Sequence, residues 1–335
     1  MSKFSWLSAK PKIPGPGPWF TETFTPHEFH SHRLERILIH KRTAFQEAAL
    51  VQSRSFGRCL ILDGETQSAA LDEAFYHESL VHPAMLLHRN PGRVLILGGG
   101  EGATAREVLR HKGVRETTMV DIDGEILNFA KKYLDQWHQG AFDDPRLKLV
   151  VKDGRKVIEE ERGLYDIILS DLPSPLPEGP AWRLYTVEFY RKLRKRLAPG
   201  GIFALQSSSG NLLQFSAHHA IVATLRRVFP VVRPYYVYIP SFDIPWGFAL
   251  CSTQKSQDPL RWTATVVEHA IRRRIRGRLA FLDGESLIGL MRPPKYYLER
   301  LKKSKAVITD ARPIFFMKDE TAPESNKFHR RQTAP

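Results

Sequence analysis

The sequence has little cysteine and no long apolar run. Only Cys59 and Cys251 among its 335 residues are cysteines, and each lies in an apolar, strand-like stretch. This usage predicts reduced core thiols of a cytoplasmic protein rather than a disulfide framework. No stretch approaches the roughly 18 apolar residues of a transmembrane helix. The first 17 residues, rich in proline and glycine, lack the pattern of a secretory signal, so we expect a flexible leader and no membrane contact.

Motifs that bind metals or nucleic acids are also missing. The chain has no C-x-x-C or H-E-x-x-H cluster, so we expect neither a metal nor another cofactor. Lysine and arginine number 50 against 36 aspartates and glutamates, which gives a net charge of +14. Much of this excess lies in "HAIRRRIRGRLAF" and "ERLKKSKAVI", which match no zinc-finger, helix-turn-helix or RNA-binding pattern. A solvated basic face is favoured, and contact with nucleic acid is not expected.

What is present from residue 93 onwards is a regular alternation of strand and helix patterns. Strands are predicted over residues 93–100, 116–123, 147–154, 165–171 and 201–207. Helices are predicted between them, over 104–112, 125–137, 155–161 and 186–197. A further helix at 217–229 precedes two strands, 231–240 and 246–252, which resemble a closing hairpin. Strands alternating with helices of about ten residues indicate parallel βαβ units, and therefore an α/β doubly wound sheet.

The flanking segments follow other patterns. Residues 31–70 contain short apolar and β-branched stretches broken by glycine and polar turns, which predict a small antiparallel β domain, assigned to residues 18–72. The helical spacing that follows opens the α/β domain, which we assign to residues 73–255. Residues 256–318 are expected to form a helical extension, and the polar residues 319–335 a disordered tail.

Acidic residues follow four of the predicted strands. They lie in "GGGEG", "VDID", "KDG" and "SDLPSP", and comprise Glu101, Asp121, Asp123, Asp153 and Asp171. In an open α/β sheet, ligands bind outside the carboxyl ends of the strands, so these side chains are predicted to converge on one edge. The alternative is that individual acids only cap the helices that follow them.

The chemistry of these acids favours a particular ligand. A carboxylate in the glycine loop, Glu101, would repel a pyrophosphate but attract a positively charged group. An acid after the second strand suits a ribose diol, because a carboxylate can accept two hydroxyl hydrogen bonds. Asp153 could accept a hydrogen bond from an adenine amino group. Together they describe a nucleoside with a cationic tail, such as an S-adenosyl compound.

Longer motifs extend this interpretation. From about Pro18 to Phe316 the chain resembles the polyamine aminopropyltransferases, the family of spermidine, spermine and thermospermine synthases. The resemblance rests on motifs such as "LILDGETQSAALDEAFYHESLVHPAML", "LILGGGEGATAREVLRHK", "YDIILSDLPSP" and "YIPSFDIPWGFALCS". "LYTVEFY" and the "PSF" segment resemble the thermospermine-type and related prokaryotic branch most closely.

The resemblance implies a Rossmann-like class I methyltransferase-type doubly wound sheet with a small N-terminal β domain, in a homodimer or homotetramer. It implies decarboxylated S-adenosylmethionine as the co-substrate and methylthioadenosine as the by-product. It makes Asp171 the catalytic residue. The donor-binding residues that it implies are Gln52, Gly98, Gly100, Glu101, Asp121, Asp123, Asp153 and Gly154. The acceptor-binding residues that it implies are Gln67, Tyr76, His77, Ser174, Tyr185, Phe242 and Trp246.

The chain departs from the family pattern on the acceptor side. Where the family has D-x-x-D-P, "DLPSP" places Ser174 at the second aspartate, and Phe242 replaces a tyrosine. Either the enzyme accepts a different amine, with Glu178 or Glu78 supplying charge, or turnover of the acceptor is weakened. A methyltransferase on the same fold and a non-catalytic polyamine- or nucleoside-binding protein remain alternatives.

Overall fold

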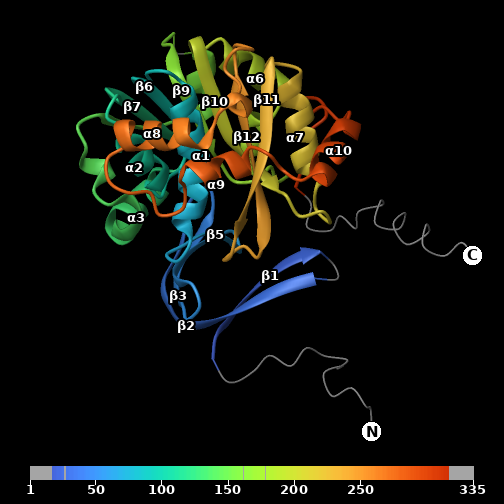
Figure 1. Ribbon diagram of the computed structural model, residues 1–335. Helices are drawn as coiled ribbons and strands as arrows, with labels where there is room; N and C mark the ends of the chain where they lie inside the picture. Colours follow the sequence, from blue (N-terminus) through green and yellow to red (C-terminus); the bar gives the residue numbers. More distant parts are fainter. Residues whose placement is uncertain (1–16, 26–27, 161, 178, 317–335) are drawn as a thin grey trace, which may run out of the picture.

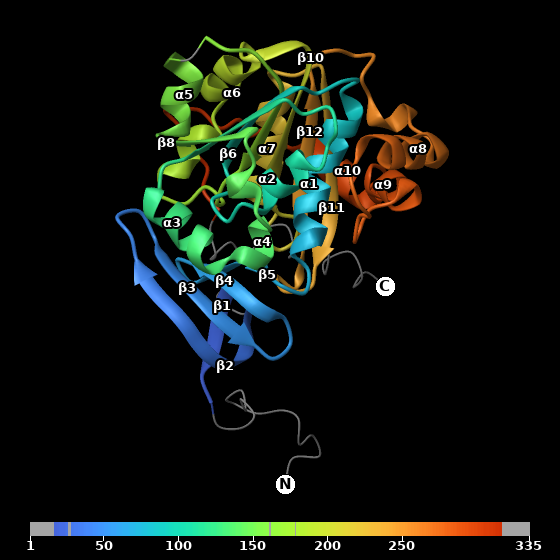
Figure 2. The same cartoon turned by 90° about the vertical axis from the view of Figure 1, so that its left-hand side faces the viewer.

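The computed structural model describes residues 17–25, 28–160, 162–177 and 179–316 (Figure 1). Nearly all of the expected leader and the whole expected tail, 319–335, lie outside these residues, as does Glu178. The described chain forms two sheets. A small N-terminal sheet lies against one end of a larger, helix-covered sheet (Figures 1 and 2).

The N-terminal sheet is antiparallel and its five strands follow one another in chain order. They are β1 (Trp19–Thr25), β2 (Glu28–Arg42), β3 (Glu47–Ser53), β4 (Gly57–Leu62) and β5 (Glu65–Ala69). The sheet curls so strongly that its two edges meet. Glu22 of β1 accepts hydrogen bonds from the backbone nitrogen and the hydroxyl of Thr66 in β5, at 2.7 and 2.8 Å. This closure brings β1, which the sequence patterns did not identify as a strand, next to β5.

The larger sheet has seven strands in the order β11-β12-β10-β9-β6-β7-β8. Their bounds are β6 (Arg93–Gly98), β7 (Glu116–Asp121), β8 (Leu147–Val151), β9 (Tyr165–Asp171), β10 (Leu197–Ser209), β11 (Val231–Ile239) and β12 (Ile244–Ser252). β6 to β10 pair in parallel, and the hairpin of β11 and β12 closes the sheet in antiparallel fashion. The chain runs from β6 outward to β8 and then returns to β9, so the strand order reverses between β6 and β9. Ligands of doubly wound sheets bind at such a reversal.

Helices cover both faces of this sheet, because its central strands are apolar on both sides. One face packs against α1 (Glu73–Leu87), α2 (Ala103–Leu109), α8 (Ala264–Arg274) and α9 (Gly284–Leu290). The other packs against α5 (Gly154–Glu160), α6 (Val187–Arg194), α7 (Ser216–Arg226) and α10 (Lys295–Lys303). Short 3-10 turns are η1 (Ala141–Asp143), η2 (Pro180–Leu184) and η3 (Pro259–Arg261). The helical extension therefore contributes to both faces.

α3 (Gly124–Tyr133) and α4 (Asp135–His138) join the two sheets. The sequence predicts a single helix over 125–137, but the chain leaves the helical conformation at Leu134, where φ is −111°. The turn directs Trp137 into the interface with the N-terminal sheet. There its ring is fully buried near Leu50 and Leu60, and its Nε1 donates to Ser68 Oγ at 2.7 Å. This anchoring holds the small sheet over the carboxyl ends of the large one.

Two simpler expectations can be compared with the structure. Cys59 and Cys251 are buried free thiols, and burial raises the pKa of Cys59 to about 12. Burial also raises the pKa of Cys251, so both are protonated core side chains. None of the described helices combines the length and apolarity that a bilayer crossing demands.

Candidate active site

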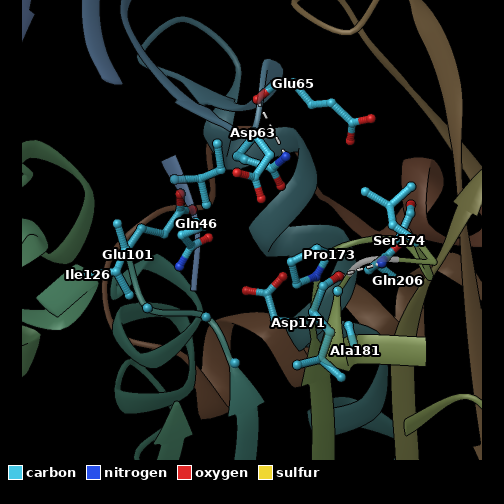
Figure 3. Close-up of a pocket in the computed structure, with 18 of the residues that line it drawn as sticks. Gln46, Asp63, Glu65, Glu101, Ile126, Asp171, Pro173, Ser174, Ala181 and Gln206 are labelled. Carbon is cyan, nitrogen blue, oxygen red and sulfur yellow. Dashed lines mark hydrogen bonds between the residues drawn. The ribbon is translucent and has the colours of Figure 1, made fainter. Parts of the chain in front are cut away.

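A cavity of about 240 Å³ lies between the carboxyl ends of β6 to β9 and the N-terminal sheet. Asp171 points into its centre, with Asp63 and Glu65 of the N-terminal sheet on the opposite side (Figure 3). The predicted residues that line it are Gln67, Tyr76, Gly98, Gly100, Glu101, Asp121, Asp153, Gly154, Asp171, Ser174, Phe242 and Trp246. Four predicted residues are not part of this lining: Gln52, His77, Asp123 and Tyr185.

The glycine loop allows neighbouring strand ends to approach one another closely. Gly98 has a φ of +79°, and a Cβ there would lie 2.2 Å from the backbone oxygen of Asp171. Gly99 donates its backbone N–H to that oxygen at 2.9 Å. A Cβ on Gly100 would lie 2.9 Å from Asp121 Oδ2. Side chains here would separate β6 from β7 and β9, and the acids at their ends would no longer share one cavity.

Two hydroxyl groups hold Asp171. Tyr76 of α1 donates to Oδ1 at 2.7 Å, and Thr104 of α2 donates to Oδ2 at 2.6 Å. Burial and the charge of Asp171 raise the pKa of Tyr76 well above its usual range, so this phenol is a donor. The carboxylate is therefore fixed in orientation while it faces the cavity. Thr104 is a contact that the sequence motifs gave no reason to select.

Glu101 is connected to a chain of alternating charges below the cavity floor. Its Oε1 lies 2.5 Å from His77 Nε2, and His77 Nδ1 lies 3.0 Å from Glu73 Oε2. Glu73 in turn accepts from both terminal nitrogens of Arg106, at 3.1 and 2.8 Å. Burial opposes the charge on His77, but Glu101 and Glu73 together raise its pKa well above the usual range.

His77, predicted to contact the acceptor, lies outside the cavity lining. The imidazole is only 2% exposed and lies behind Glu101, so it meets a carboxylate rather than the cavity. The reason is helical geometry, because successive residues of α1 point about 100° apart. Tyr76 faces the cavity and His77 therefore cannot. Burial raises the pKa of Glu101, and His77 opposes that rise.

Asp121 and Asp153 occupy the ends of the neighbouring strands. Burial is the main cause that raises the pKa of Asp121 to about 6. Its Oδ1 accepts the backbone N–H of Asp123 at 2.9 Å, and Oδ2 lies toward Gly100. Asp153 accepts the N–H of Arg155 at 2.8 Å, at the start of α5. Both carboxylates are thus anchored by backbone groups and line the cavity.

Asp123, predicted to bind the donor, lies outside the cavity lining and makes other contacts. Its Oδ1 caps α3 by accepting the backbone N–H groups of Glu125 and Ile126 at 3.0 and 3.2 Å. Its Oδ2 accepts from Thr43 at 2.6 Å and from Gln46 at 3.0 Å, both in the turn between β2 and β3. The helix-capping alternative is therefore the better account of this one acid.

Gln46, in the turn before β3, lines the cavity together with Gln67 of β5, whereas Gln52 does not. Gln52 lies six residues further along, near the other end of β3, which at about 3.3 Å per residue is roughly 20 Å away. Gln46 and Gln52 lie six residues apart, an even spacing that an alternating strand pattern does not distinguish. Only their position along the sheet differs. The hydrogen bond from Gln46 to Asp123 places Gln46 beside the cavity. This bond is a tertiary contact, so the sequence alone does not reveal it.

Tyr185 supports the acceptor side from behind. Its hydroxyl donates to the backbone oxygen of Pro173 at 3.0 Å and accepts from Gln206 Nε2 at 2.8 Å. Tyr185, predicted to bind the acceptor, thus holds the loop after Asp171, and Gln206 lines the cavity. Ser174 also lines it, and its hydroxyl donates to Ser208 at 3.3 Å.

Glu78 does not supply the charge that the loop lacks. It is almost fully buried and accepts the backbone N–H groups of Ala280, Phe281 and Leu282 at 2.6 to 3.0 Å. The carboxylate therefore fixes the helical extension to α1, away from the cavity lining. The other candidate, Glu178, lies outside the described residues.

The fold and the site define a class: Rossmann-like proteins with a strongly acidic cavity at the carboxyl ends of the parallel strands. Comparisons with known proteins make this specific. Residues 73–259 match the spermine/spermidine synthase domain, and residues 18–69 match the spermidine synthase tetramerisation domain. The chain therefore belongs to the spermine/spermidine synthase family, which confirms the resemblance seen in the motifs. The second match also indicates an oligomer.

Individual relatives agree with this assignment. A polyamine aminopropyltransferase of Sulfurisphaera tokodaii is 43% identical, covering 88% of this chain and 97% of the relative. One of Synechococcus sp. is 40% identical, covering 87% and 95%. The structure of a spermidine synthase with the transition-state analogue AdoDATO has a TM-score of 0.79 at 27% identity, covering 88% of this chain and 98% of the other. The spermidine synthase of Thermotoga maritima has a TM-score of 0.78 at 27% identity, covering 88% and 97%. These likenesses confirm the predicted fold and the predicted aminopropyltransferase class.

Proposed function

We propose that this enzyme transfers the aminopropyl group of decarboxylated S-adenosylmethionine to an amine and releases methylthioadenosine. The observation that supports this most directly is the charge of the cavity. Seven carboxylic acids line it, namely Glu22, Asp63, Glu65, Glu101, Asp121, Asp153 and Asp171. No lysine, arginine or histidine is among the described residues of the lining. In a chain with a net charge of +14, this concentrates negative potential where two cations must meet.

The donor is assigned to the side of β6, β7 and β8. Asp121 would accept hydrogen bonds from the ribose hydroxyls, and Asp153 with Gly154 would contact the adenine. Glu101 would hold the ammonium of the aminopropyl tail, while His77 favours the ionised form of Glu101 by opposing the rise of its pKa. Gln46 and Gln67 are proposed to contact the tail from the N-terminal sheet, because both line the cavity.

Asp171 is assigned the proton transfer. An alkyl amine has a pKa near that of lysine, about 10, so it arrives protonated and without a lone pair. The carboxylate attracts this ammonium and accepts its proton as the nitrogen attacks the carbon beside the sulfonium. The new C–N bond forms as the C–S bond breaks, and methylthioadenosine leaves as a neutral thioether. Tyr76 and Thr104 keep the carboxylate in the orientation that this attack requires.

We also propose a cellular location and an oligomeric state for the enzyme. The two buried free thiols agree with a cytoplasmic protein. The N-terminal match favours a homotetramer over a homodimer. The resemblance of "LYTVEFY" to the thermospermine-type branch remains a prediction about the product.

The test is incubation of the purified protein with decarboxylated S-adenosylmethionine and a panel of amines, with methylthioadenosine release as the readout. Mass spectrometry should find products that have gained three carbons and one nitrogen. S-adenosylmethionine serves as the control donor. Transfer of a single carbon from it would instead identify a methyltransferase. Binding of both substrates without any release would indicate a non-catalytic protein.

A further inference from the structure

The last described segment of the chain, residues 307–316, returns from α10 to the active-site cavity, and we call it the C-terminal strap. Val307, Ile308 and Ile314 pack into the core on the α6 face of the large sheet. Phe316, only 8% exposed, is buried at the cavity and forms part of its lining. The proposed reaction assigns no role to this segment.

The strap is first fixed at Ile308, which is almost fully buried. The backbone oxygen of Ile308 accepts the N–H of Val187, at the start of α6, at 2.9 Å. The backbone N–H of Ile308 donates to Thr224 Oγ1 of α7 at 2.9 Å. These two bonds tie the strap to both helices and fix the point at which it passes them.

A second anchor joins the strap to the donor side of the cavity. Both terminal nitrogens of Arg155 donate to Asp310, at 2.8 and 2.5 Å, and these bonds hold the pKa of Asp310 below its usual range. Arg155 also donates to the backbone oxygen of Arg183, in η2, at 3.1 Å. Its own backbone N–H holds Asp153. One arginine therefore links the strap, η2 and the strand end that carries Asp153.

The strap ends on the loop that follows Asp171. Phe316 donates its backbone N–H to the oxygen of Pro175 at 2.7 Å. The ring of Phe315 packs edge-on against Trp182 of η2, with ring centroids 6.2 Å apart. The loop and η2 form one wall of the cavity, beside Asp171 (Figure 3). The lining residues of this wall are Leu172, Pro173, Ser174, Leu176, Pro180, Ala181 and Leu184.

This loop has few attachments of its own. Residues 173, 175 and 177 are prolines and supply no N–H. Leu172, Pro173 and Ser174 are held by Gln206, Tyr185 and Ser208. Beyond them, over the described residues 175–177, the bond from Phe316 is the only hydrogen bond to the rest of the described chain. The position of this part of the wall therefore depends on the strap.

We infer that the C-terminal strap belongs to the active site and that Phe316 is a positioning residue, which holds the loop after Asp171 as a fixed wall of the cavity. This inference rests on the proposed function and adds a positioning residue to it. A wall that is fixed before the substrate arrives avoids the entropy cost of ordering it on binding. Asp171 itself is held by Tyr76 and Thr104, which are not part of the strap. Loss of Phe316 should therefore weaken binding more than it slows the chemical step.

The first experiment measures methylthioadenosine release as a function of donor concentration with saturating amine. Phe316→Ala should raise the KM for the donor about tenfold, the cost of ordering one or two loop residues, and leave kcat within about threefold of wild type. Phe316→Leu keeps a large apolar side chain and should recover most of the loss. Arg312→Ala, at an exposed position of the strap, is the matched control and should keep the wild-type KM.

Asp310→Ala tests whether the strap acts as a unit. Asp310 does not line the cavity, so its loss can reach the loop only through the strap. The KM for the donor should rise in this variant also, by about threefold or more. A rise in Phe316→Ala alone would mean that Phe316 acts only by direct contact, which would overturn the role of the strap. A fall in kcat with an unaltered KM would overturn the positioning role.

Hydrogen exchange in the absence of substrates tests the strap independently of the reaction. Peptides that cover residues 171–184 should exchange faster in Phe316→Ala and Asp310→Ala than in wild type and Arg312→Ala. Peptides from β2, in the other sheet, should exchange at the wild-type rate in every variant. Unaltered exchange over 171–184, or an equal increase in β2, would contradict a local role.

The failure of the underlying function has a separate signature. If the wild-type protein releases no methylthioadenosine with any amine, the proposed reaction is wrong, while exchange over 171–184 still decides whether the strap holds the loop. If the wild-type protein reacts and Phe316→Ala keeps the wild-type KM, the reaction stands and only the role of Phe316 is wrong.

Discussion

Replacing Asp171 by asparagine should separate proton transfer from binding. Asparagine has the same shape as aspartate but cannot take the proton of an ammonium. The two hydroxyls that hold the carboxylate, of Tyr76 and Thr104, can each accept as well as donate a hydrogen bond. The amide can therefore be accommodated without moving α1 or α2, and we expect Asp171→Asn to fold.

The size of the effect follows from the geometry of the site. The carboxylate receives hydrogen bonds at 2.7 and 2.6 Å and is the base assigned to the reaction. Loss of a positioned base costs roughly 10²–10⁴ in rate, which corresponds to about 3–5 kcal/mol of transition-state stabilisation. Thr104→Val is the comparison, because it leaves the base in place and removes only one orienting hydrogen bond. Its loss of kcat should be about tenfold.

The assay is single-turnover release of methylthioadenosine with saturating amine, together with calorimetric binding of methylthioadenosine. The neutral product does not need the charge of Asp171. Its dissociation constant should change by less than about threefold, which is under 1 kcal/mol. A rate for Asp171→Asn within tenfold of wild type would refute the assignment of the base. A rate for Thr104→Val as low as that of Asp171→Asn would show that orientation, rather than proton transfer, dominates.

Three further predictions concern the same cavity. His77→Gln removes the cation behind Glu101, so the donor KM should rise. The melting temperature should fall, because breaking a buried ion pair costs about 3–5 kcal/mol. An unaltered KM together with an unaltered melting temperature would contradict this prediction. Because the pKa of Asp121 is about 6, methylthioadenosine should bind most tightly above pH 6 and about tenfold more weakly per unit below it, as the carboxylate becomes protonated. Calorimetry at pH 7.5 and 5 checks this, and a pH-independent constant would refute it. Gly98→Ala should lower the free energy of unfolding in urea by at least about 2 kcal/mol, whereas Gly289→Ala in α9, where a Cβ meets nothing within 4 Å, should not lower it.

Some of the site could be read from sequence because it depends on local pattern and topology. Alternating apolar strands and helices predict parallel pairing, and parallel pairing places Glu101, Asp121, Asp153 and Asp171 at one edge. The structure places all four in the lining of one cavity. Asp123 follows the same strand as Asp121 but points into the start of α3. Two acids in one short motif were therefore indistinguishable until the direction of each side chain was known.

Three other predicted residues, His77, Gln52 and Tyr185, lie outside the cavity lining for a similar reason. His77 and Tyr76 are adjacent, and only the packing of α1 decides which of them faces the cavity. Gln46 lies in the turn before β3 and Gln52 near the far end of that strand, and only the position of the N-terminal sheet decides which of them reaches the site. Tyr185 has an aromatic ring suited to an amine, yet its hydroxyl holds the loop from behind.

The sequence by itself determined the alternation of strands and helices from residue 93 onwards, the fold class and the acids at the strand ends. Hydrophobic periodicity and turn residues act over a few neighbouring residues and define the elements. The handedness of βαβ connections then restricts how consecutive parallel strands are arranged. Only the tertiary structure decided which residues of the N-terminal sheet complete the cavity. Glu22 and Glu65 are separated by a whole antiparallel sheet along the chain, and the curl that joins β1 to β5 brings them together. Contacts of that kind arise from packing between domains, which no local pattern encodes.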